Sequence, residues 1–229
     1  MRFRAPIGRA GPPVALVYRG PASLPGCPEA VARLLKASRW GFDVRYVGPD
    51  GDVPLSARTL RGATLYAQPG GDSLEDAYRR LRRHRRAIRR FVHSGGRYLG
   101  FCLGGYLAGA TPGFALLPGD TDQYIASPAA TVADEEDTLV DVSWRGSKRT
   151  LFFQDGPYFE VRADADATVL ATYPNGAIAA LVAGFGCGRV GVVGPHPEAT
   201  EDWYADAGLS VDRLGIDLGL DLVDAVMRP

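Results

Sequence analysis

The sequence predicts an α/β fold: a mostly parallel sheet covered by helices, with a β-hairpin embellishment at about residues 120–165. In the first half of the chain, short apolar runs of strand length alternate with stretches of helical apolar spacing. Between residues 120 and 160, short β-like pieces follow one another between acidic and Gly/Pro-rich turns. We find no internal repeat and no low-complexity linker, so we expect residues 1–229 to form a single domain.

The first half begins with a buried strand, because the run Val-Ala-Leu-Val-Tyr at 14–18 follows Gly-Pro-Pro. Helical spacing of Val31, Leu34 and Leu35 predicts the next element. Alternating and apolar runs then predict further strands, one of them ending at Pro-Gly-Gly. The elements expected here are strands at 14–18, 42–47, 64–68 and 97–101 and helices at 28–38 and 74–93.

The second half is expected to be richer in strands and to close with one helix. Ser210 is the expected N-cap of that helix, since apolar residues follow it at helical spacing. The strands expected here lie at 138–144, 150–153, 168–173, 178–183 and 189–193.

Composition excludes several classes of protein. Hydrophobic residues make up 46% and charged residues 23% of the chain, which is typical of a globular protein. The 26 basic and 26 acidic residues cancel, so no overall field attracts nucleic acid or a membrane surface. No apolar run approaches the roughly 20 residues that span a bilayer, and residues 1–4 do not lead into a secretory signal. We therefore expect a cytoplasmic protein.

Eight arginines between residues 79 and 90 suggest a nucleic-acid surface at first sight. The same segment has a stripe of residues spaced by three and four that predicts a buried helix face, with the arginines on the solvent side. This second interpretation is the better supported one, and we expect no nucleic-acid partner. The stripe consists of Ala77, Leu81, His84, Ile88 and Phe91.

The strongest chemical signal is Gly-Phe-Cys-Leu-Gly at 100–104, at the end of a predicted strand. In a nucleophile elbow the central residue sits on a sharp strand-to-helix turn, which requires small residues such as Gly100 and Gly104 on either side. The turn places the Cys102 sulfur at a helix N-terminus, where the thiolate is favoured. The alternative is a small buried core cysteine. Cys27 is expected to begin a helix and Cys187 to lie in a hairpin turn, and three scattered cysteines make no zinc site or disulfide framework.

A nucleophilic thiol needs a base and a group that orients the base. His196 follows the strand at 189–193, at the sheet edge where α/β folds bind ligands, and Glu198 lies two residues further on. The alternative for this pair is a surface loop that starts a helix. Backbone amides of Leu103, Gly70 and Gly71 are the candidates for an oxyanion hole.

Three motifs together resemble those of class I glutamine amidotransferases: Pro-Gly-Gly at 69–71, Gly-Phe-Cys-Leu-Gly-Gly at 100–105 and Pro-His-Pro-Glu at 195–198. The whole chain is most similar to the amidotransferase-like N-terminal domain of large biotin protein ligases, through Gly-Pro at 20–21, Gln-Asp-Gly-Pro-Tyr at 154–158 and Leu-Ala-Thr-Tyr at 170–173. The resemblance implies a flavodoxin-like three-layer sandwich with helices on both faces, and a catalytic triad of Cys102, His196 and Glu198.

The chain departs from the family pattern in two places. Tyr106 stands where glutamine amidotransferases usually have a Gln that helps to hold substrate glutamine, so glutaminase activity is in doubt. The adenylating loop of a biotin ligase is missing, and Gly-Cys-Gly-Arg at 186–189 leads into a strand instead. By analogy, Gln154, Asp155 and Tyr158 are expected to line the pocket, unless their Gly-Pro segment merely reverses a strand.

We therefore expect a hydrolase or amidotransferase that acts on a small-molecule carboxamide through a thioester, without a cofactor or metal. A separate synthase or acceptor enzyme and a homodimer are both left open. A binding or regulatory module that keeps the pocket but lacks turnover is the alternative, because of Tyr106. A redox or stress-response cysteine protein is a third, weaker possibility.

Overall fold

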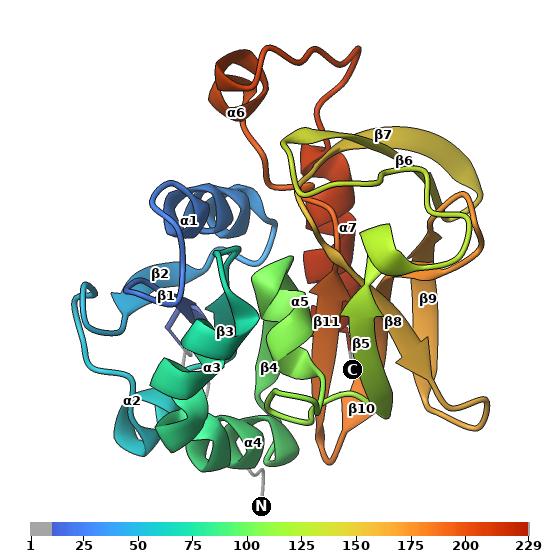
Figure 1. The fold of residues 1–229 in the computed structure, drawn as a ribbon. Helices are drawn as coiled ribbons and strands as arrows, with labels where there is room; N and C mark the ends of the chain where they lie inside the picture. The colour runs from blue at the N-terminus through green and yellow to red at the C-terminus, as the bar shows by residue number, and fades with distance from the viewer. Residues whose placement is uncertain (1–10, 229) are drawn as a thin grey trace, which may run out of the picture.

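The computed structural model describes residues 11–228, which build one eleven-stranded sheet with helices on both faces (Figure 1). The α/β class is confirmed. The segment at 1–4, from which we expected no secretory signal, lies outside the described residues. Among residues 11–228, no helix is long and apolar enough to cross a membrane.

The parallel part of the sheet has five strands in the order β2-β1-β3-β4-β11. If β11 is counted as the fifth of these strands, this is the flavodoxin-like order 2-1-3-4-5 that the resemblance implied. The strands are β1 (Val14–Tyr18), β2 (Asp43–Val47), β3 (Leu65–Gln68), β4 (Arg97–Phe101) and β11 (Gly188–Val193).

Beyond β11 every pairing is antiparallel, so the sheet is mixed and its parallel part is smaller than expected. β10 pairs with β11, β9 with β10, and the β6–β7 hairpin continues the sheet from β9. A second branch runs from β10 through β8 to β5. These strands are β5 (Gly119–Gln123), β6 (Thr138–Trp144), β7 (Ser147–Phe153), β8 (Pro157–Val161), β9 (Ala167–Thr172) and β10 (Ile178–Phe185).

Helices cover both faces and form the outer layers of the sandwich. α1 and α7 pack together on one face, where Leu34, Leu35 and Leu222 are fully buried. Apolar residues of α2, α3, α4 and α5 share a second core on the other face. The helices are α1 (Cys27–Ala37), α2 (Ala57–Arg61), α3 (Leu74–Leu81), α4 (Arg85–His93), α5 (Leu103–Ala108), α6 (Glu201–Asp206) and α7 (Ile216–Met227), with short 3-10 turns η1 (Arg82–His84) and η2 (Tyr124–Ala126).

Two expectations about helices are wrong in detail. The helix expected at 74–93 is interrupted by η1, although Ala77, Leu81 and Ile88 of its apolar stripe are buried. The terminal helix begins at Ile216, with Gly215 at its N-cap, rather than at a capping Ser210. Residues 201–208 form the separate helix α6 and the turn after it, where the sequence pattern predicted no helix.

The sheet register brings together the chain segments that carry the predicted chemistry. Gln68 of β3 lies beside Gly100 of β4, and Phe101 of β4 lies beside Val193 of β11. All three strands are parallel, so their carboxyl ends meet at one edge. Consequently the loops that follow them, with Gly70, Cys102 and His196, emerge next to one another.

Candidate active site

Cys102 occupies a sharp turn between β4 and α5. Its φ of 47° and ψ of −107° place a non-glycine residue in a strained region of backbone space, as a nucleophile elbow requires. The Cys102 amide donates to the carbonyl of Val193 at 2.9 Å, and the Cys102 carbonyl accepts from the amides of Gly105 and Tyr106 at the start of α5. The turn is therefore held on both sides.

Gly100 and Gly104 are packed too tightly for a side chain. A Cβ on Gly100 would collide with the carbonyl group of Gly104, and a Cβ on Gly104 would collide with the carbonyl oxygen of Gln68. In both cases the neighbouring atoms belong to the backbone, which cannot rotate away. These contacts give the physical reason for the Gly-x-Cys-x-Gly pattern.

Gly104→Ala is expected to lower the free energy of unfolding by about 1–3 kcal/mol, because β3 and α5 must move apart to accept the methyl group. Urea unfolding measures the loss. Gly62→Ala is the matched control, since its added Cβ would meet nothing closer than the Thr59 carbonyl oxygen at 3.6 Å. Equal stability of the two variants would contradict the packing argument.

His196 and Glu198 form a buried pair in the loop after β11. Nδ1 of His196 lies 2.9 Å from Oε1 of Glu198, and only 4% of the His196 surface and none of the Glu198 surface is exposed. The Cys102 side chain also interacts with the imidazole, and this interaction raises the pKa of His196. Because Nδ1 faces Glu198, Nε2 is the nitrogen left for the sulfur. The structure thus pairs His196 with Glu198 and brings the Cys102 side chain next to the imidazole.

The charge state of the imidazole is set by its neighbours. Burial alone lowers the pKa of His196, but the charges of Glu198 and Cys102, together with side-chain interactions with both, raise this pKa to about 10. A protonated imidazole is therefore favoured at neutral pH.

Cys27 is the second cysteine near this pair. It begins α1, and a Cβ on Gly70 would lie 2.8 Å from Cε1 of His196 and 3.4 Å from the Cys27 sulfur. Burial raises the pKa of Cys27 far above its usual value, and the charges of Glu198 and Cys102 raise it further. Cys27 is therefore held as a neutral thiol.

The three residues suggested for an oxyanion hole lie around the same point. A side chain on Gly71 would collide with that of Leu103, so the loop after β3 touches the first residue of α5. Gly70 lies against the His196 ring, since a Cβ on Gly70 would come within 2.8 Å of Cε1 of His196. The glycines at 70 and 71 permit this close approach, which a Cβ at either position would block.

Of the residues suggested for the substrate pocket, the structure places three at a cavity beside Cys102 and one away from it. The carbonyl oxygen of Gln154 lies 3.5 Å from the Cys102 sulfur, and Asp155 follows with a φ of 43°. Gln154, Asp155 and Tyr106 line a cavity at Cys102. Tyr158 does not line this cavity or the one at His196, and its hydroxyl points to Glu160 at 3.4 Å.

Two cavities flank the Cys102–His196 pair. The smaller, of about 120 Å³, is lined by Cys102 and Leu103; the larger, of about 450 Å³, is lined by His196, Cys27 and the α6 residue Trp203. Both are also lined by Leu24, Gly71 and Gln154. A still larger cavity of about 620 Å³ lies among Tyr18, Pro49 and the arginines at 79–83, and it contains none of the predicted site residues.

Sequence reasoning missed the aromatic walls around His196. Phe152 of β7 and Trp203 of α6 meet the imidazole with ring centroids 6.1 and 5.2 Å away. The backbone amide of His196 donates to the carbonyl of Phe152 at 2.9 Å, which fixes this loop on β7. The signal that would have found Trp203 is Glu-Asp-Trp-Tyr, three residues beyond Glu198. Figure 1 shows α6 and the β6–β7 hairpin at the same end of the molecule.

Comparisons with known proteins agree with this architecture. Residues 15–127, just under half of the chain, match the family model described as "Biotin-protein ligase, N terminal", which confirms the resemblance. A search of curated proteins found no match.

Solved structures of low sequence identity have the same fold. PurLQS from Thermotoga maritima is 20% identical with a TM-score of 0.61, over 91% of this chain and 97% of that chain. A glutamine amidotransferase is 18% identical with a TM-score of 0.59, over 86% and 99%. The GH42 β-galactosidase Gan42B from G. stearothermophilus is 16% identical with a TM-score of 0.52, over 93% of this chain and 29% of that chain. The fold is thus amidotransferase-like, but it also occurs within a glycosidase, so the activity must be argued from the site.

Proposed function

We propose that this chain, with its biotin-protein ligase N-terminal pattern on an amidotransferase-like fold, is a cysteine-dependent hydrolase or amidotransferase of carboxamides. One observation carries the proposal: a buried imidazole is hydrogen bonded to a carboxylate and interacts with a cysteine on a strained elbow. This is the nucleophile, base and orienting group that acyl transfer by a thiol requires.

The reaction has two halves. The Cys102 thiolate forms a bond to the amide carbon, and the carbonyl electrons move to an oxyanion that the amides of Leu103 and Gly71 stabilise. Protonated His196 then gives its Nε2 proton to the nitrogen, the C–N bond breaks and the amine leaves. Neutral His196 next removes a proton from water or an acceptor amine, which attacks the thioester and releases Cys102. Throughout, Oε1 of Glu198 accepts a hydrogen bond from the Nδ1–H group of His196, with 2.9 Å between Nδ1 and Oε1.

The first test is the pH dependence of Cys102 alkylation by iodoacetamide, followed by peptide mass spectrometry. An ordinary thiol has a pKa near 8.5. We expect labelling of Cys102 to persist at pH 6 and to exceed that of exposed Cys187 by at least about tenfold. The excess should disappear in His196→Ala, which removes the partner of the thiolate, and should remain in the control His84→Ala.

A second candidate function is a binding or regulatory module without turnover. Tyr106 favours it, because a bulky aromatic ring lines the small cavity where the resembling enzymes use Gln. Alkylation profiles that match an ordinary thiol in both the parent and His196→Ala would make this the better description.

A further inference from the structure

We propose that the site selects amides whose acyl group is positively charged, carrying an ammonium or guanidinium group, and that glutamine is a poor substrate. The inference rests on the proposed function, since it assigns a substrate class to the same nucleophile. The acidic lining of the cavity that opens onto Cys102 is what points to it.

The two cavities have different roles, because one contacts Cys102 and the other contacts His196. The small cavity contacts Cys102 and Leu103 but not His196, so it lies on the side of the sulfur that receives the acyl group. The larger cavity contacts His196 but not Cys102, so it lies on the side where the imidazole protonates the leaving amine. An amide bound across Gly71 and Gln154, which line both cavities, would place one half in each.

The small cavity is acidic. Three carboxylates line it, from Asp72, Glu135 and Asp155, and no lysine, arginine or histidine does. Its volume of about 120 Å³ corresponds to roughly four water molecules at about 30 Å³ each. A short acyl chain that ends in a cation fits this space and this charge.

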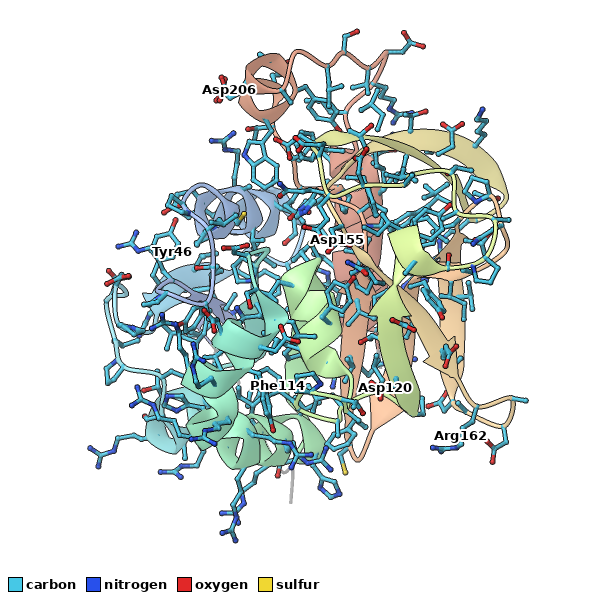
Figure 2. All side chains as sticks on the ribbon, viewed as in Figure 1. Tyr46, Phe114, Asp120, Asp155, Arg162 and Asp206 are labelled. Atoms are coloured by element: carbon cyan, nitrogen blue, oxygen red, sulfur yellow. The ribbon has the colours of Figure 1, made fainter. Side chains whose placement is uncertain are left out.

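Polar atoms in this lining lack partners. Oδ1 of Asp155 and the hydroxyl of Tyr106 are both buried, and neither has a hydrogen-bond partner within residues 11–228. The other oxygen of Asp155 accepts from the side-chain amide of Gln123 at 2.9 Å, so the carboxylate is held in place. Figure 2 labels Asp155 in the region between α1 and the β6–β7 hairpin. An ammonium group supplies the donors that these two oxygens lack.

The carboxylates also repel one another while no cation is present. Burial raises the pKa of Asp155, and the charge of Glu135 raises it further. The same two carboxylates add to the raised pKa of Tyr106. A bound cation would relieve this repulsion, whereas glutamine would relieve it less, because its α-carboxylate offsets the charge of its α-ammonium group.

The lining of the larger cavity is also acidic, but less strongly so. Four carboxylates and one guanidinium, that of Arg33, line it together with the Trp203 ring, and a cation can pack against such a ring. Glu29 is partly neutralised, because Arg19 lies 3.6 Å from it. The carboxylates belong to Glu29, Asp137, Asp202 and Asp206. The leaving amine or acceptor therefore also meets a mostly negative lining, as the acyl group does in the small cavity.

Charge selection at Cys102 can be measured with three methanethiosulfonates: cationic aminoethyl, anionic sulfonatoethyl and neutral methyl. In each reaction the thiolate attacks the sulfenyl sulfur, a mixed disulfide forms and methanesulfinate leaves with the bonding electrons. Peptide mass spectrometry without reductant gives the rates at Cys102 and, as an exposed reference in the same molecule, at Cys187. We expect the cationic-to-anionic rate ratio at Cys102 to exceed that at Cys187 by at least about tenfold.

Variants assign the selection to the cavity. Glu135→Gln and Asp155→Asn should each lower the ratio at Cys102 severalfold. Glu136→Gln, a neighbour that is exposed like Glu135 but lines neither cavity, should leave the ratio unchanged. Equal ratios at the two cysteines, or a ratio that no cavity variant lowers, would overturn the substrate class. The neutral reagent separates the substrate class from the proposed function. If Cys102 reacts with this reagent like an ordinary thiol while the charge selection is intact, the result counts against acyl transfer but not against the preference for cations.

Discussion

Cys102→Ala is expected to abolish acyl transfer, with a loss of at least about a thousandfold, because no other group within the triad can form the thioester. The small activated ester para-nitrophenyl acetate provides the measurement, since its acetyl group suits a cavity of about 120 Å³. The parent protein should release nitrophenolate and carry an acetyl group on Cys102 that mass spectrometry detects.

The fold should survive this change. Alanine lacks only the sulfur, and the elbow is held by backbone hydrogen bonds to Val193, Gly105 and Tyr106 that the substitution leaves in place. Thermal melting checks this. Cys187→Ala is the matched control and should retain full activity, because Cys187 is exposed and lies outside both cavities. Nitrophenolate release by Cys102→Ala at the rate of the parent would refute the assignment of the nucleophile.

Sequence patterns predicted the parallel part of the sheet well, and the reason is burial. β1, β3, β4 and β11 are covered on both faces, so they appear as continuous apolar runs with sharp ends. β5 is different, because its sequence Gly-Asp-Thr-Asp-Gln is polar and at most half-buried. Its pairing with β8 depends on contacts between distant segments, which no local pattern reveals.

Helix boundaries were predicted less well where local signals were ambiguous. The apolar stripe continues across residues 82–84, so periodicity alone gives no sign of the 3-10 turn there. At the C-terminal end, Ser210 is a good capping residue by type, yet α7 starts only at Ile216. Arg149 of β7 makes hydrogen bonds of 2.7 and 2.8 Å to Asp217 in the first turn of α7 and of 3.1 Å to the carbonyl of Leu214. Tertiary contacts thus override the local cap signal.

In the candidate site, too, some residues stand in local motifs and others come together only in the folded chain. Cys102, His196 and Glu198 stand in short motifs at strand ends, where a parallel sheet must bring them to one edge, so the sequence reveals them. The acidic lining does not stand in one motif, because Asp72 follows β3, Glu135 precedes β6 and Asp155 follows β7. Only the three-dimensional arrangement shows that these carboxylates share a small cavity with the nucleophile.

Glu198→Gln is expected to slow acyl transfer by about ten-thousandfold, the size of loss that follows when the orienting carboxylate of a serine-protease triad becomes an amide. Gln preserves the shape but removes the charge that helps to raise the pKa of His196 to about 10. Burial then lowers this pKa against the interaction with Cys102 alone, so the protonated imidazole is less favoured and stabilises a thiolate less. The rate of nitrophenolate release measures the loss, and Glu201→Gln, an exposed change of the same kind on α6, should have no effect.

The same variant predicts how stability depends on pH. In the parent, the folded-state pKa of His196 lies above the unfolded value of about 6.5, so protonation favours the folded state. This contribution is complete below about pH 6.5 and declines as the pH rises toward 10, because both states then lose the proton. The melting temperature of the parent should therefore exceed that of Glu198→Gln most at pH 6, and the difference should narrow by pH 10. A difference that stays constant across this range would show that Glu198 stabilises the fold by packing and not through the charge of His196.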